Sequence, residues 1–234
     1  MKWSFEEDYV VGKFYLSHVD SWRNHIDDLL TELRQYNAGR DKGSASMRVQ
    51  NIESLHVGKG LSNVAKQTKN VYDALVGKRN VPQDSSGLQA YITKNFVPNE
   101  ELDQETFTDA MIGMTSFVPI DPVGPSFQEL LFKFIDDKKL RDPEVYKRSH
   151  VGRDTFANIR AGKRGVSKRT VKQLCFGLKL SYEDAVMLMA SAGFAFSNND
   201  IGDLIVVYFL KNKIYDIYEV DIELYERKQA LLFN

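Results

Sequence analysis

The residues best suited to chemistry lie between positions 153 and 169, where cationic and hydrogen-bonding side chains follow one another closely. Thr and Asn can form hydrogen bonds with base edges, and Arg can bind guanine or a phosphate through two parallel hydrogen bonds. Lys side chains and the free amides at a helix start suit phosphate oxygens. The candidate nucleic-acid ligands in this stretch are Arg153, Thr155, Asn158, Arg160, Lys163, Arg164, Lys168 and Arg169.

The charge distribution favours the same region. The chain carries 31 Lys and Arg against 32 Asp and Glu, a formal net charge of -1. Residues 126–180, however, hold fourteen basic and six acidic residues, whereas residues 81–125 hold one and seven, and residues 181–234 four and nine. Clustered positive charge is typical of proteins that bind polyanions. The alternative explanation of this charge distribution is a solvated surface that binds no ligand.

The sequence does not indicate catalytic chemistry. None of the four histidines is spaced i, i+4 from another, and the single cysteine, Cys175, allows neither a disulfide nor a Cys pair for zinc. No glycine-rich phosphate loop follows a predicted strand. Glu226 and Lys228 have a spacing found in some nucleases, but they fall on a predicted helix without the sheet that such sites use. We therefore expect a non-enzymatic protein without a cofactor or a metal.

The composition is that of a globular protein, with 43% hydrophobic and 27% charged residues. No apolar run approaches the roughly 20 residues that span a bilayer. The first residues lack the apolar stretch of a signal peptide, and a single cysteine fits a reducing compartment. These features predict a cytoplasmic protein that does not act at a membrane.

The candidate ligands require a short helix that presents one side to solvent. Phe156 and Ile159 stand three positions apart, which predicts that they anchor a helix at 154–160 to the body of the protein. A supporting helix at 142–149 is expected to precede it, because Asp142 before a proline is typical of a helix start. The polar side chains between the two anchors then face outward.

Apolar residues recur at helical spacing along most of the chain, which predicts an all-α fold with two small helical bundles. The first bundle spans residues 1–76, where a capping box of Ser4 and Glu7 opens the first of four helices. The fourth of these is expected to begin near Ser62. The second bundle spans residues 126–234, where another capping box opens the first of seven short helices.

Residues 77–125 differ from both bundles because they hold five of the six prolines and an acidic cluster. The helical pattern is interrupted at both ends of this segment, at residues 77–87 and 118–125, as is typical of loops. Between them, Leu88 and Ile92, and then Phe107 and Met111, are spaced as in two short amphipathic helices. We expect a partly ordered connector.

The basic segment resembles a known family. The runs 156–164, 167–174 and 178–181 follow the order of the recognition helix, glycine stop, basic turn and fourth helix of the lambda-repressor-like, or XRE-type, helix-turn-helix family. The resemblance covers about residues 126–193 and implies DNA binding and transcription regulation. Tyr146 stands where the family usually keeps a small residue, and His150 where glycine or asparagine usually takes a left-handed turn.

Residues 126–234 as a whole are also similar to the helical tail of some bacterial macrodomain proteins. This similarity implies a bacterial protein. The last two predicted helices are acidic and rich in aromatic residues. They are expected to pack as core, with a homodimer or a protein-partner surface as the alternative.

A second resemblance covers roughly residues 1–56. Trp3 and Trp22 are nineteen residues apart and each starts a predicted helix, as in the Myb/SANT family, although Val49 stands where a third tryptophan is usual. The resemblance implies a three-helix unit whose third helix contacts DNA, with protein binding or simple packing as the alternative. The candidate ligands on the outward face of this helix and beside it are Lys42, Ser46, Met47, Arg48 and Gln50.

Together these observations predict a transcriptional regulator or targeting subunit that binds double-stranded DNA. A short recognition helix would enter the major groove, and Lys and Arg would contact phosphates. The alternative is a protein–protein adaptor in a bacterial defence or mobile-element system that does not bind nucleic acid.

Overall fold

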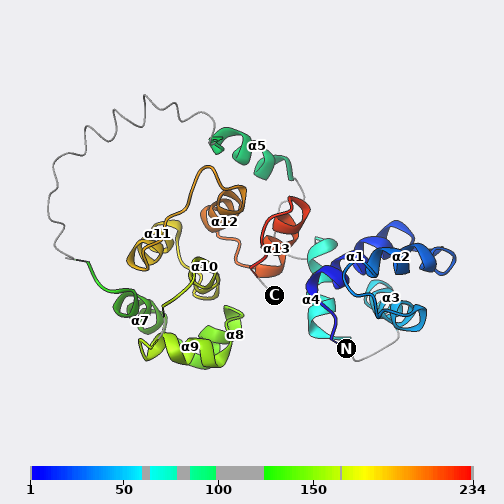
Figure 1. Ribbon diagram of the computed structural model, residues 1–234, viewed down its shortest axis with the longest axis horizontal. Helices are drawn as coiled ribbons and strands as arrows, with labels where there is room; N and C mark the ends of the chain where they lie inside the picture. The colour runs from blue at the N-terminus through cyan, green and yellow to red at the C-terminus, as the bar shows by residue number, and fades with distance from the viewer. Residues whose placement is uncertain (1, 60–63, 78–84, 99–123, 164, 233–234) are drawn as a thin grey trace. The chain divides into compact units, whose positions relative to one another are not determined.

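The computed structural model describes five stretches of the chain: residues 2–59, 64–77, 85–98, 124–163 and 165–232. These stretches contain twelve α-helices and no strand, so the predicted all-α class is confirmed (Figure 1). None of their helices combines the length and the apolarity needed to cross a bilayer.

The helices form two compact units. Unit 1 comprises residues 1–83 together with residues 218–234, and unit 2 comprises residues 84–217. This division differs from the boundaries predicted at 76 and 126, because the last helix groups with the N-terminal helices and a helix of the predicted connector groups with unit 2.

Unit 1 is built around its first helix. Ser4 caps this helix by accepting a hydrogen bond from the amide of Glu7, whose side chain accepts one from the Ser4 amide, which confirms the predicted capping box. The core of the unit includes Val11, Leu29 and Ile52, which are fully buried. The helices of unit 1 are α1 (Phe5–Ser17), α2 (Ile26–Leu33), α3 (Lys42–Val57), α4 (Lys66–Leu75) and, from residue 218 onward, α13 (Ile217–Glu226), with a 3-10 turn at Trp22–Asn24. The predicted start near Ser62 lies outside the described residues.

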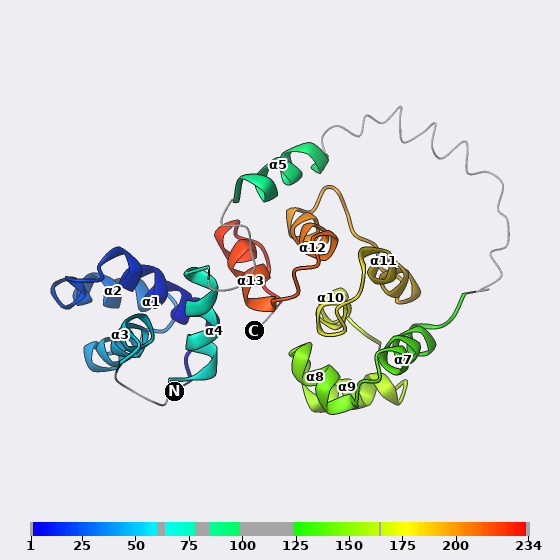
Figure 2. The same cartoon turned by 180° about the vertical axis from the view of Figure 1, so that it is seen from behind.

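Unit 2 surrounds a central helix. Figures 1 and 2 show α10 with α8, α11 and α12 around it. Ser126 and Glu129 form the predicted capping box of α7. The helices of unit 2 are α5 (Ser85–Asn95), α7 (Phe127–Asp137), α8 (Asp142–Arg148), α9 (Arg153–Arg160), α10 (Lys168–Gly177), α11 (Tyr182–Ser191) and α12 (Ile201–Lys211).

The predicted connector contributes one described helix. In α5, Leu88 and Ile92 are buried, as their helical spacing predicts, and the helix packs against α12. The backbone amide of Val97 then donates a hydrogen bond to the carbonyl of Asn198 at 3.0 Å. The second helix expected in this segment, around Phe107, lies outside the described residues.

Candidate nucleic-acid interface

A tight turn joins α8 to α9 and fixes the direction of α9. His150 in this turn has a φ of 52°, so the left-handed conformation expected at this position is present. Val151 donates its backbone N–H to the carbonyl of Tyr146 at 3.0 Å. The Tyr146 ring lies 6.2 Å from the ring of Phe156, so this bulky side chain packs between the two helices.

Helix α8 begins at Asp142, as predicted, but Asp142 does not cap it. Arg141 is the N-cap, and the Glu144 side chain accepts a hydrogen bond from the Arg141 amide at 3.0 Å. Asp142 and the proline after it occupy the first two helical positions. Proline fits there because the first amides of a helix have no intrahelical acceptor.

Helix α8 approaches α10 very closely at Gly177. A Cβ atom at this position would lie 2.0 Å from Oγ of Ser149 and 2.7 Å from its backbone nitrogen. Only glycine therefore allows this distance between the two helices. The close approach thus lies at Gly177 and not at Tyr146, where the lambda-repressor-like family usually keeps a small residue. Gly177 could not be predicted, because a glycine inside a helix does not by itself indicate a contact.

Helix α9 is amphipathic in the predicted sense. Phe156 and Ile159 are 2% and 3% exposed and anchor the helix to unit 2. Arg153, Thr155 and Asn158 are exposed on its other side. The outer face of α9 therefore offers one cation and two hydrogen-bonding side chains to a ligand.

Two of the predicted cations already have acidic partners. The Arg160 guanidinium forms an ion pair with Asp142 and lies 5.0 Å from the centre of the Phe132 ring. Lys168 lies 2.5 Å from Asp203, a fully buried carboxylate that also pairs with Lys172. Lys168 therefore has a structural role, which the sequence did not predict because the acid is 35 residues away.

A hollow lies between α9 and the start of α10, and Thr155 is the predicted ligand that lines it within the described part of the chain. Its volume is about 420 Å³, and Thr155, Gly165 and Ser167 are among its lining residues. Ser167 accepts a hydrogen bond from the amide of Thr170 at 3.2 Å and so caps α10. Lys163 and Arg169 are exposed. Arg164 lies outside the described residues.

The candidates on α3 are arranged differently. Lys42 pairs with Asp27 at 2.7 Å, and Arg48 is buried beside Asp8, with 3.0 Å between the Arg48 Nε and a carboxylate oxygen. Arg48 is predicted to flank the outward face of this helix, but it is buried because its guanidinium balances a fully buried charge. Ser46 is half-buried, while Met47 and Gln50 are exposed.

Arg48 belongs to a buried group of charges at the start of unit 1. Arg40 donates a hydrogen bond of 2.7 Å to Glu7, and the guanidinium groups of Arg40 and Arg48 lie 4.0 and 4.5 Å from the centre of the Trp3 ring. Burial raises the pKa of Asp8 despite the nearby charge of Arg48. Burial also acts to raise the pKa of Glu7, but the hydrogen bonds from Arg40 and the Ser4 amide lower it overall.

The described stretches hold no cluster of side chains suited to a metal ion. No group of three or more His, Cys, Asp or Glu side chains there is placed to hold a metal ion. Burial raises the pKa of the Cys175 thiol to about 12, so this side chain is a poor nucleophile. Glu226, part of the nuclease-like spacing, accepts hydrogen bonds from Tyr9 and Lys13 at 2.6 and 3.2 Å.

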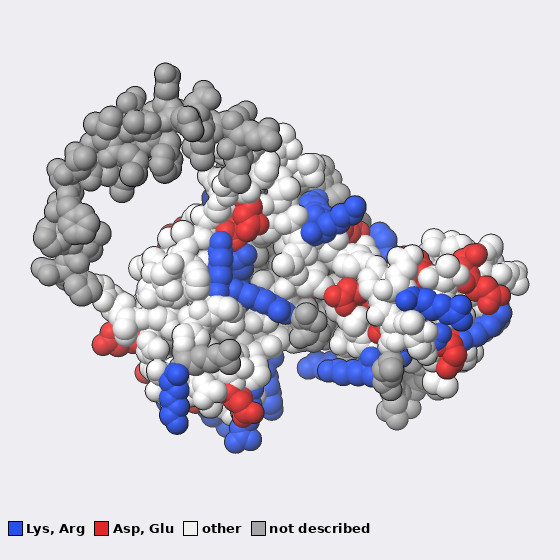
Figure 3. Space-filling model, viewed as in Figure 1, with Lys and Arg blue, Asp and Glu red and all other residues white. Residues whose placement is uncertain are grey.

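The charges of unit 2 are mixed rather than uniformly positive. Figure 3 shows Lys and Arg side chains beside acidic ones at the end of the unit where Figure 1 places α8 and α9. One such acid is Asp154, an exposed residue in the first turn of α9. Comparisons with protein-family models, with curated proteins and with solved structures found no match.

Proposed function

We propose that this protein binds double-stranded DNA through α9 and acts in the cytoplasm as a transcriptional regulator or targeting subunit. The observation that carries this proposal is the outer face of α9, where Arg153, Thr155 and Asn158 are exposed while two apolar anchors hold the helix in place. A short helix anchored in this way can enter a major groove, as in helix-turn-helix proteins.

Phosphate contacts would come from cations at the two ends of α9. Arg153 at its start and Lys163 after its end are exposed, and neither has an ion-pair partner in the described part of the chain. Arg160 and Lys168 are engaged with Asp142 and Asp203, so they contribute less to a phosphate contact. Sequence readout would then rest on Thr155 and Asn158.

The test is a fluorescence-polarisation titration of the full chain against random duplex DNA at low and near-physiological salt. Arg153→Ala combined with Lys163→Ala is expected to weaken binding at least tenfold and to reduce the log–log salt slope by about two, one for each lost phosphate contact. The matched control is Lys66→Ala with Lys69→Ala, which removes the same charge from an exposed face of α4. An equal loss in both double variants would show that only net charge matters.

The second candidate function is a protein adaptor. The exposed apolar side chains of α11, Val186 and Met187 at 39% and 49%, favour it because they are free to contact a protein surface. Absence of any salt-sensitive DNA binding, together with unchanged helical content, would reject the DNA proposal in favour of the adaptor. A duplex RNA of the same sequence, titrated in parallel, distinguishes a DNA-binding protein from an RNA-binding one.

A further inference from the structure

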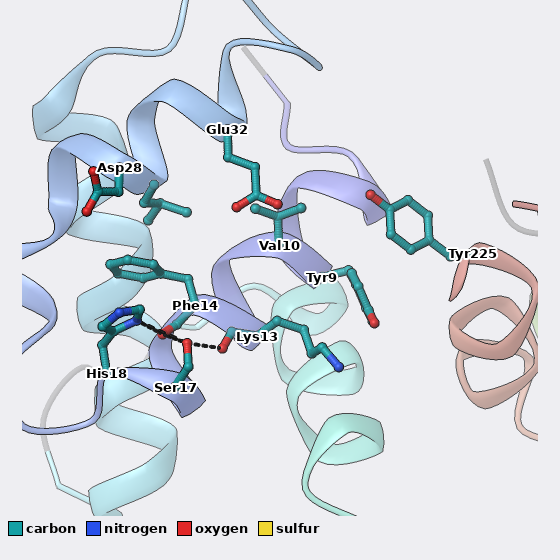
Figure 4. A pocket seen from close by; sticks show the side chains of 10 residues that line it. Tyr9, Val10, Lys13, Phe14, Ser17, His18, Asp28, Glu32 and Tyr225 are labelled. Atoms are coloured by element: carbon teal, nitrogen blue, oxygen red, sulfur yellow. Dashed lines mark hydrogen bonds between the residues drawn. The ribbon is translucent and has the colours of Figure 1, made fainter. Parts of the chain in front are cut away.

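A pocket in unit 1 is lined by aromatic rings and carboxylates (Figure 4). Its residues come from α1, α2 and the end of α13, and its volume is about 420 Å³. Pockets of roughly 300–1,000 Å³ commonly hold small-molecule ligands. We call it the Tyr225 pocket, after the α13 ring that forms one of its sides.

Aromatic rings stand on two sides of the Tyr225 pocket. Figure 4 shows Phe14 and His18 on one side and Tyr225 on the other. The rings of Phe14 and His18 stack with their centres 4.7 Å apart, and those of Tyr9 and Tyr225 are also 4.7 Å apart, with planes inclined by 54°. The faces of such rings carry a negative quadrupole that attracts cations.

Carboxylates line the same space. Figure 4 shows the Glu32 side chain reaching from α2 into the space that Tyr225 enters from α13. The Glu32 carboxylate has no hydrogen-bond or ion-pair partner among the described residues. Asp28 faces His25 at 3.5 Å, an ion pair only when His25 is protonated. The charge of Glu32 is also one of the causes, after burial and the hydrogen bond with Tyr36, that raise the pKa of Tyr225.

The single lysine of the pocket does not balance these acids. Lys13 lies 3.2 Å from Glu226, a residue outside the pocket, and this ion pair neutralises its charge. The Lys13 ammonium also lies over the Tyr9 ring, 5.8 Å from its centre, so the face of one ring of the pocket already accepts a cation. The lining therefore keeps the negative charges of Asp28 and Glu32.

We propose that the Tyr225 pocket binds a small organic cation that carries an alkylammonium group. The rings would enclose the alkyl groups, and Glu32 would balance the charge. This proposal is independent of DNA binding, because a phosphate would be repelled by the same carboxylates.

The test uses choline and its neutral isostere 3,3-dimethylbutan-1-ol as probes, titrated into the full chain by calorimetry. Choline is expected to bind about tenfold more tightly than the alcohol, since each exposed cation–π contact and the added ion pair contribute a few-fold. Glu32→Gln should weaken choline binding roughly fivefold and leave the alcohol unaffected. Tyr225→Leu should weaken it by a similar factor, whereas Tyr225→Phe, which keeps the ring, should stay within about twofold.

The control is Glu183→Gln, which removes an exposed acid from α11 in unit 2. Tryptophan fluorescence of each variant reports whether unit 1 is folded, because Trp3 and Trp22 are the two tryptophans of the chain. Equal affinity for choline and the alcohol, no binding of choline at millimolar concentration, or an equal effect of Glu183→Gln would each overturn the proposal.

Discussion

Helices α3 and α9 both carry Lys or Arg side chains, but those of α3 are paired with acids, whereas Arg153 at the start of α9 is exposed. On α3, Arg48 is buried against Asp8, and Lys42 pairs with Asp27. On α9, Arg153 is exposed and has no ion-pair partner in the described stretches. Whether a cation is available to a ligand is thus decided by the acids that the fold brings near it, and these acids come from other helices.

The two arrangements also differ in their energetic consequences. A buried ion pair is costly to break, because the remaining charge loses its partner in a medium of low polarity. An exposed cation contributes little to stability, because water and salt screen it. Substitutions on α3 and α9 should therefore separate cleanly into effects on stability and effects on binding.

The largest effect is expected for Arg48→Met. Loss of the guanidinium leaves Asp8, which is fully buried, with hydrogen bonds from Gln67 and Thr68 but without its ion pair. We expect unit 1 to lose about 3–5 kcal/mol of stability, measured by urea unfolding followed by tryptophan fluorescence. Lys42→Met removes the other α3 cation, whose partner Asp27 is 73% exposed, and should cost less than about 1 kcal/mol. Similar losses in both variants would contradict the comparison.

A somewhat smaller effect is expected for Gly177→Ala, which tests what holds α9 in position. The added methyl group would meet both the side chain and the backbone of Ser149, so α8 and α10 must separate, at a cost of about 3 kcal/mol. DNA binding through α9 should weaken at the same time. Far-UV circular dichroism during urea unfolding follows the helices of both units, whereas tryptophan fluorescence follows unit 1 alone, because unit 2 contains no tryptophan. A shift of the dichroism transition without a shift of the fluorescence transition therefore measures the loss in unit 2. Gly152→Ala is the control, since its nearest contact would be an ordinary 3.6 Å.

Next in size is the pH dependence of Glu7→Gln. The pKa of Glu7 in the folded protein lies below its ordinary value of 4.5, so its contribution to stability is complete above that pH and disappears as pH falls through the lowered pKa. The pKa of Asp8 is raised, so the effect of Asp8 on the pH dependence of stability has the opposite sign. Asp8 is present in both the wild type and the variant. We expect a loss of about 2 kcal/mol at neutral pH.

The difference between wild type and Glu7→Gln should then shrink below pH 4.5. Tryptophan fluorescence during urea unfolding at several pH values measures it. A difference that stays constant down to acidic pH would mean that Glu7 acts through its shape alone and not through its charge.

Much of the fold could be predicted because it depends on local patterns. Each capping box, at Ser4 and at Ser126, involves residues within four positions of the sequence. The two buried anchors of α9, Phe156 and Ile159, lie within one helical turn of each other. Helix position, helix type and the buried side of α9 therefore follow from the sequence.

The charge pairing could not be predicted because it is non-local. Asp8 is 40 residues from Arg48, and Asp203 is 35 residues from Lys168. Nothing in the spacing of these residues distinguishes a buried acid from an exposed one. The same limit applies to the last helix, which the sequence places in the predicted bundle of residues 126–234. The hydrogen bond that ties this helix to α1 joins Tyr9 and Glu226, which are more than 200 residues apart.

The smallest expected effect, and the one that isolates α9 most directly, is that of Asp154→Asn. This exposed carboxylate stands in the first turn of α9, between Arg153 and Thr155, where it would repel a phosphate or a base oxygen. Removing it should strengthen DNA binding about two- to threefold at low salt, with less gain at higher salt because the repulsion is screened. Stability should change by less than about 0.5 kcal/mol, since the favourable interaction of an acid with the helix start is weak at an exposed site. The control is Glu183→Asn, which removes an acid from the first turn of α11. If polarisation titrations show the same gain for both variants, the DNA responds to the net charge of the chain and α9 is not the contact surface.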